Sequence, residues 1–392
     1  MDTQQKLELL ADASRHDLSC ACATQKDEHR RRGPDGLWLY PVTLPSGGTS
    51  VMLKTLLSNA CSYDCRYCPF RSDQDPRRCT LSPDEIAAVF LEYARSGRVF
   101  GLFLSSGVIR DPDYTMDRMA AVARILRKKG YRGYLHLKVI PGASEAAIEE
   151  LVSLSSAVSL NVEVPTAASF AALSQRKDFH RDIVRPMRAI SRLTAKGGRY
   201  SRVKTSTQFI VGASDEKDAD IVRATYGLYR RLGLSRVYFS AYQRGLGAPS
   251  LPGERKPPAP GATGSQGPRG SAVLPSRAAE PGDLLTREHR LYQADFLIRR
   301  YRWDAADILF EPDGNLSLAV DPKQRWADSH PELFPVRLLS AEKESLLRVP
   351  GLGPITVDRI LETRRQGILR DLADVGLRGE RLRKASAYLV RD

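Results

Sequence analysis

The feature that most constrains the fold is a repeated alternation between short apolar runs and amphipathic helical stretches over residues 50–242. This alternation is typical of βα units around a parallel sheet. The strand-like runs are 50–57, 101–106, 134–140, 157–164, 204–212 and 236–242. The helical stretches between them are 83–96, 115–129, 144–155, 182–196 and 216–232. Six such strands predict an α/β chain that folds as a partial (β/α)6 TIM-like barrel.

The chain divides into five segments. We expect an N-terminal extension at 1–48, the barrel at 49–243, and a Pro/Gly-rich linker or disordered insertion at 244–283. Helical character returns at 283–302 and 304–310, so residues 284–336 are predicted to buttress the barrel. Residues 337–392 read as a separate small all-α domain.

The composition and charge of the chain indicate the kind of protein it is and the partners it is expected to bind. No apolar stretch reaches the roughly 18 residues of a membrane helix, and the N-terminus lacks the apolar core of a secretory signal, so a cytoplasmic location is expected. Sixty Lys and Arg face 46 Asp and Glu, a formal charge of +14 that favours nucleic acid as a partner. The alternative is that this charge reflects an Arg-rich composition and has no ligand.

Three cysteines crowd into eight residues directly after the first predicted strand: Cys61, Cys65 and Cys68. The carboxyl ends of barrel strands carry the active site in βα barrels. Three thiolates bind three irons of a [4Fe-4S] cubane and leave the fourth iron open. A zinc site is the alternative, although zinc usually takes four ligands and no second cysteine pair follows. The other cysteines, Cys20, Cys22 and Cys79, are scattered, which favours plain reduced thiols over an auxiliary cluster.

The cysteine loop, including the aromatic Tyr67 before the last cysteine, resembles that of the radical SAM superfamily. The resemblance implies a [4Fe-4S] cluster that binds S-adenosyl-L-methionine at its open iron. One electron then cleaves a sulfur–carbon bond and releases a 5′-deoxyadenosyl radical, which abstracts hydrogen from a substrate. It also implies an electron donor such as flavodoxin or ferredoxin.

Other landmarks of that superfamily occur in altered form at later strand ends. Ser105, Ser106 and Gly107 resemble the position of its Gly-Gly-Glu element, which contacts the methionine amino group, but the carboxylate is missing. Asn161 and Glu163 alternate with apolar residues and resemble its ribose-contacting pair, unless they form a solvated rim.

The fifth strand resembles the adenine-contacting element of the superfamily. That resemblance rests on Gln208 and Gly212, with Gly212 as a close-approach glycine. Lys138 near the end of the third strand is a candidate to face a carboxylate or phosphate of the cofactor, or else an exposed lysine.

Residues 346–361 resemble a helix-hairpin-helix motif, in which a Gly-x-Gly turn joins two short helices and presents backbone amides to a phosphate. A weaker copy follows at 372–389. Residues 337–392 carry 12 Lys and Arg against 8 Asp and Glu, which suits backbone contact without base reading. The predicted contacts are Gly351, Gly353, Thr356 and Arg359. Such hairpins also serve as protein-interaction modules.

Taken together, the cysteine loop, residues 102–116, residues 287–295 and the hairpins resemble the putative DNA modification/repair radical SAM family. That resemblance implies association with a uracil-DNA-glycosylase-like protein. Three hypotheses follow: a radical enzyme acting on DNA, a radical enzyme modifying tRNA or other RNA, and a non-catalytic nucleic-acid-binding protein whose cluster senses redox state.

Overall fold

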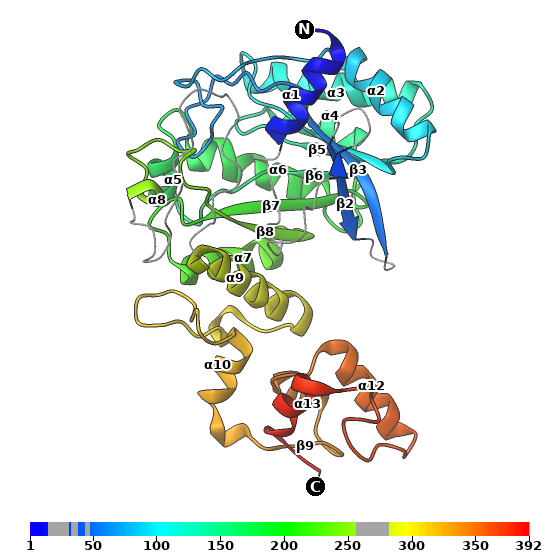
Figure 1. Ribbon diagram of the computed structural model, residues 1–392, viewed down its shortest axis with the longest axis vertical. Helices are drawn as coiled ribbons and strands as arrows, with labels where there is room; N and C mark the ends of the chain where they lie inside the picture. The colour runs from blue at the N-terminus through cyan, green and yellow to red at the C-terminus, as the bar shows by residue number, and fades with distance from the viewer. Residues whose placement is uncertain (15–30, 33–37, 44–47, 256–281, 392) are drawn as a thin grey trace. The chain divides into compact units, whose positions relative to one another are not determined.

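The computed structural model describes residues 1–14, 31–32, 38–43, 48–255 and 282–391 (Figure 1). The chain separates into two compact units, Met1–Glu216 with Gly227–Glu288, and Lys217–Tyr226 with His289–Asp392. Cys20, Cys22 and most of the predicted linker lie outside the described residues. No helix of the described residues has both the length and the apolar character needed to cross a membrane.

The first unit is built on an eight-stranded sheet whose strands follow one another in chain order. Its parallel strands are β3 (Thr49–Leu56), β4 (Gly101–Ser105), β5 (Tyr134–Lys138), β6 (Ala157–Ser159), β7 (Lys204–Val211) and β8 (Arg236–Ala241). Two antiparallel strands extend it, β2 (Trp38–Thr43) on β3 and β1 (Arg31–Arg32) on β2. The six parallel strands confirm the predicted partial (β/α)6 barrel.

Successive helices of the first unit pack beside one another in chain order (Figure 1). They are α2 (Pro83–Arg95), α3 (Pro112–Lys128), α4 (Glu145–Leu154) and α6 (Arg185–Leu193); α7 (Asp218–Leu232) follows β7 in the chain. Helix α2 begins as its sequence predicts, because the Ser82 hydroxyl accepts from the Glu85 amide and the Glu85 carboxylate accepts from the Ser82 amide at 2.7 Å.

Three parts of the first unit differ from the sequence-based expectation. The fourth strand was expected at 157–164 but ends at Ser159, and beyond it Glu163, with a φ of 66°, forms an isolated bridge to Phe209. The helix expected at 182–196 is formed by the end of a π-helix (Phe179–Val184) and by α6, which has Pro186 in its first turn. Helix α5 (Ala167–Leu173) before them was not predicted. The N-terminal helix α1 (Thr3–Ala13) was not predicted, and neither was β2, whose Pro41 is unusual in a strand.

The remaining elements are mostly helical. They are α8 (Pro252–Arg255), α9 (Gly282–Tyr301), α10 (Pro322–Asp328), α11 (Lys343–Arg348), α12 (Pro354–Arg365) and α13 (Gly379–Ser386), with 3-10 turns at Ala305–Asp307 and Pro331–Leu333. The helix expected at 304–310 is wrong, since only one capped turn forms before the chain extends at Ile308. A short parallel pair, β9 (Val336–Arg337) with β10 (Leu389–Val390), interrupts the predicted all-α C-terminus.

The turn between α11 and α12 packs tightly against α13. Gly351 has a φ of 86°, and a Cβ added there would lie 2.9 Å from the Arg381 carbonyl oxygen and 3.1 Å from the Ala385 amide nitrogen. Only glycine meets both demands without moving the backbone. The packed core beneath this turn consists of residues such as Leu346, Val349 and Ile360.

The Leu352 carbonyl of the same turn points to a buried lysine. Lys323 donates to it at 2.6 Å and the Tyr301 hydroxyl donates at 3.3 Å. Burial lowers the pKa of Lys323 to about 7; Asp321 raises this pKa, whereas Lys384 and Arg348 lower it further. Lys323 therefore holds the turn by a hydrogen bond, and the free energy needed to bury its charged form reduces the stability of the fold at pH values where it is protonated.

Replacing Gly351 by Ala should destabilise the second unit more than the same change at Gly367. Gly367 also has a positive φ, 70°, but a Cβ there meets nothing within 4 Å. We expect about 1 kcal/mol of destabilisation for G367A and about 1–3 kcal/mol more for G351A. Urea unfolding of the full chain, followed by tryptophan fluorescence, measures the difference, since Trp303 and Trp326 lie in this unit. Equal losses in the two variants would contradict the packing account.

Replacing Lys323 by Met should change how stability depends on pH. A lysine whose folded pKa is lowered costs stability below about pH 7 and recovers it as pH rises toward the unfolded value of 10.5. Between pH 7 and 9 the wild-type chain should therefore gain up to about 2 kcal/mol relative to K323M. Urea midpoints at the two pH values test this, and parallel profiles for the two proteins would count against it.

Candidate functional site

A cavity of about 200 Å³ lies at the carboxyl ends of the parallel strands in the first unit. It brings together the three cysteines and nearly all the other cofactor residues predicted from the sequence. Its lining includes Cys61, Cys65, Cys68, Tyr67, Ser105, Ser106, Gly107, Lys138, Asn161, Glu163 and Gln208. The predicted Gly212 is the exception, since it is not part of the lining.

The cysteine loop is held by the loop that follows β4. The Val108 amide donates to the Cys61 sulfur at 3.4 Å, and the Phe70 amide donates to the Cys68 sulfur at the same distance. Gly107 is required for this approach, because a Cβ there would lie 2.4 Å from the Ala60 carbonyl oxygen. The packing of the two loops therefore explains the glycine at position 107 without any contact to a cofactor.

The three cysteine side chains line one cavity, and three thiolates are the protein ligands of a [4Fe-4S] cluster with one open iron. No three His, Cys, Asp or Glu side chains of the described residues are grouped so as to hold one metal ion. The thiolates of a cubane bind three different irons, so they stand farther apart than zinc ligands do. Burial raises the pKa of both Cys61 and Cys68, and the positive charge of bound iron would favour their thiolate forms. The residues present therefore fit a [4Fe-4S] cluster.

Cys79 is separate from this group. It is buried, its sulfur donates to the Lys6 carbonyl oxygen at 3.7 Å, and it does not line the cavity. The prediction that Cys79 is a plain reduced thiol agrees with this position.

A tyrosine–carboxylate pair forms one wall of the cavity. The Tyr67 hydroxyl donates to Glu163 Oε1 at 2.7 Å, and Glu163 is only 5% exposed. Burial, followed by the Glu163 charge, raises the pKa of Tyr67, so the phenol stays protonated and remains a donor. Although β6 ends before them, Glu163 and Asn161 both line the cavity, because the Glu163 backbone still pairs with β7 through Gln208 and Ile210.

The end of β7 is shaped by its own hydrogen bonds. Gly212 has a φ of 90°, and its amide donates to Glu216 Oε1 at 2.6 Å. A Cβ at Gly212 would lie 2.5 Å from a Leu284 methyl carbon, so the close approach is to α9. Contact of Gly212 with a cofactor remains a prediction, whereas Gln208 lines the cavity directly.

Lys177 is a cavity residue that sequence reasoning missed. It is 7% exposed and lines the cavity beside the cysteines. Burial alone would lower its pKa, but the charges of Cys65 and Glu163 and a hydrogen bond to Cys65 raise the pKa overall. No sequence motif marks this position, since it follows a short helix that was not predicted.

The predicted nucleic-acid contacts gather at the α11–α12 turn of the second unit. Gly353 is the N-cap residue of α12, and Thr356 and Arg359 lie on the first two turns of this helix. Arg359 is exposed and Thr356 is partly exposed, while Gly351 is committed to packing against α13.

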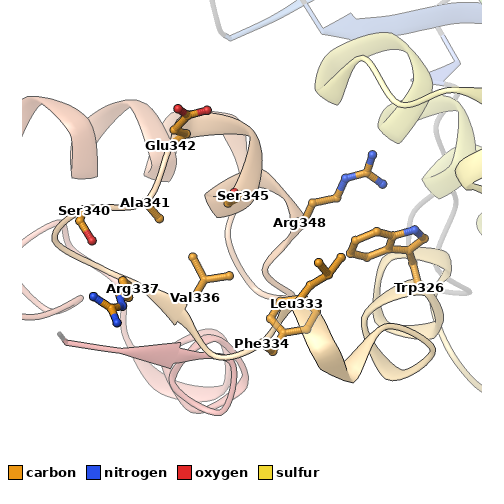
Figure 2. A pocket seen from close by; sticks show the side chains of 10 residues that line it. All are labelled: Trp326, Leu333, Phe334, Val336, Arg337, Ser340, Ala341, Glu342, Ser345 and Arg348. Atoms are coloured by element: carbon orange, nitrogen blue, oxygen red, sulfur yellow. The ribbon is translucent and has the colours of Figure 1, made fainter.

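Figure 2 shows a second cavity, of about 350 Å³, in the same unit. Apolar side chains such as Phe334 and Val336 and polar ones such as Ser340 and Ser345 line it. At its edge, the Arg348 guanidinium lies 4.4 Å from the Trp326 ring centroid and pairs with Asp307 at 3.0 Å. None of the predicted contact residues lines this cavity.

One segment of the chain matches a known family model. Residues 55–225 match the model of the radical SAM superfamily. No curated protein matches the chain in sequence.

Solved structures resemble the chain only distantly. The FeFe-hydrogenase maturase HydG from Carboxydothermus hydrogenoformans has a TM-score of 0.43 at 16% identity, over 63% of this chain and 51% of that one. Methylornithine synthase (PylB) has a TM-score of 0.42 at 14% identity, over 52% and 56% of the two chains. The chain thus spans about half the length of each. Residues 55–225, somewhat less than half of the chain, are thus similar to the radical SAM superfamily, whose members use a [4Fe-4S] cluster and S-adenosylmethionine.

Proposed function

We propose that this radical SAM enzyme acts on nucleic acid, with DNA favoured over RNA. The observation that carries the proposal is the Gly351–Gly353 turn between α11 and α12, which resembles a helix-hairpin-helix turn and lies in a basic C-terminal segment. Such turns bind phosphate through backbone amides without reading bases. A uracil-DNA-glycosylase-like partner and a cytoplasmic location remain part of this proposal.

The first unit would hold the cofactors through residues of the cavity. Cys61, Cys65 and Cys68 would bind the cluster, and the cluster with S-adenosylmethionine supplies a 5′-deoxyadenosyl radical after one-electron reduction. Tyr67 holds the Glu163 carboxylate through its 2.7 Å hydrogen bond, and Glu163 and Asn161 would be the residues that contact the ribose of bound S-adenosylmethionine. The Ser105 and Ser106 backbone and hydroxyl groups are the candidates to accept from the methionine amino group.

The second unit supplies the phosphate-binding geometry. Lys323 and Tyr301 turn the Leu352 carbonyl inward, which removes an acceptor that would repel phosphate from the hairpin surface. Gly353 then starts α12, whose positive dipole end favours an anion. Arg359 stands one turn further on, exposed, as a second phosphate donor.

The radical activity should depend on Cys65. After anaerobic iron–sulfur reconstitution, C65A should lose bound iron and at least 100-fold in 5′-deoxyadenosine formation from S-adenosylmethionine, because a cubane needs its three ligands. C79A is the matched control, since Cys79 lies outside the cavity, and it should keep both iron and activity. Persistence of deoxyadenosine formation in C65A would rule out the assigned ligand set.

The nucleic-acid interface should depend on Arg359. R359A should weaken binding of duplex DNA several-fold and reduce the slope of log affinity against log salt by about one, as expected for one lost phosphate contact. R188A is the matched control, because it also removes one positive charge, at an exposed position on α6 of the first unit. It should change neither the affinity for duplex DNA nor the salt dependence of binding.

Fluorescence anisotropy with DNA and RNA of equal length, at several salt concentrations, measures these effects. Tighter binding of RNA at every salt concentration would favour the RNA-modifying hypothesis. Equal behaviour of R359A and R188A would count against the hairpin as the interface.

A further inference from the structure

The segment after α5 is tied directly to the cysteine loop. Asp64 stands between the first two cysteines, and its carboxylate accepts from the Ser174 hydroxyl at 2.5 Å, the Gln175 amide at 2.8 Å and the Arg176 amide at 3.2 Å. Hydrogen bonds with these groups lower the pKa of Asp64 although burial opposes them, so the carboxylate stays charged.

Two further contacts bind the same segment to the loop. The Arg66 amide donates to the Leu173 carbonyl oxygen at 2.8 Å. The Arg176 guanidinium donates to the Ser62 carbonyl oxygen at 2.7 Å. The position of the next residue, Lys177, is therefore determined by the loop that carries the cysteines, and not by a strand of the barrel.

The Lys177 side chain enters the cavity and is almost completely buried, at 7% exposure. Its ammonium lies 5.5 Å from the Tyr63 ring centroid and 5.3 Å from that of Phe170. It lines the same cavity as Cys65 and Glu163, whose negative charges raise the pKa of Lys177 against the effect of burial. A cation so deeply buried is retained only where fixed negative charge offsets its desolvation.

Charge beside a cluster alters how readily it accepts an electron. Net charge and hydrogen bonds to the ligand sulfurs set the reduction potentials of iron–sulfur centres, and burial strengthens both effects. One-electron reduction adds one negative charge to the group held by the cysteines. An ammonium buried in the same cavity as the cysteines stabilises the reduced state, which carries that added charge, more than the oxidised state.

We propose that Lys177 is a positioning residue that raises the reduction potential of the cluster held by Cys61, Cys65 and Cys68. It acts through its positive charge in the cavity that the cysteines line, and Asp64 holds its backbone in place. The inference concerns the first unit alone, so it does not depend on the nucleic-acid substrate.

The test is a redox titration of the reconstituted full chain, monitored by the electron paramagnetic resonance signal of the reduced cluster. No nucleic acid and no turnover are needed. In K177M the ratio of reduced to oxidised cluster at the wild-type midpoint should fall about tenfold, equivalent to about 59 mV for one electron. K177R keeps the charge and should titrate close to the wild-type protein.

K204M is the matched control. Lys204 is exposed at the first residue of β7, so this variant removes the same charge away from the cavity and should leave the potential unchanged. K177Q, a second neutral variant that keeps an N–H donor, should shift in the same direction as K177M. A wild-type potential in K177M at full iron content would overturn the proposal. Loss of iron from both neutral variants, with retention in K177R, would also overturn it and assign Lys177 to cluster retention.

Discussion

The carboxylate of Asp64 is the contact on which the geometry of the cavity depends. It lies within the cysteine loop and accepts three hydrogen bonds from residues more than a hundred positions later in the chain. Those bonds close the loop against the segment after α5 and bring Lys177 to the cysteines. Gly107 allows a second contact with the cysteine loop, because the absence of a Cβ lets the loop after β4 approach the Ala60 carbonyl oxygen.

The cavity assembled in this way collects groups that would be costly to bury separately. Three thiols, the Glu163 carboxylate and the Lys177 ammonium share one enclosed space. Tyr67 satisfies one carboxylate oxygen, and the ammonium offsets negative charge from the carboxylate and the sulfurs. Such fixed charges would influence the one-electron reduction of a cluster held by the three cysteines, and that reduction is the first requirement of radical SAM chemistry.

The sequence predicted the barrel and the cysteine site because both rest on local signals. Apolar runs mark the strands, and the spacing from Cys61 to Cys68 marks the ligands. Lys177 could not be predicted, because its position depends on long-range hydrogen bonds between Asp64 and the residues just before it. No local sequence pattern records those bonds. Glu163 was predicted for the wrong local reason: the strand ends at Ser159, and a positive φ, in place of strand alternation, directs the side chain. Gly351 was expected to contact a phosphate, whereas the structure requires glycine there because a Cβ would clash with the backbone of α13.

The central claim is that three cysteines hold a cubane whose fourth iron is open to S-adenosylmethionine. Mössbauer spectroscopy of the chain reconstituted with iron-57 tests it most directly. The account predicts four irons per chain, with the signal of one iron changing when S-adenosylmethionine is added and the other three unaffected. Four irons that all keep their signals in the presence of S-adenosylmethionine would contradict it.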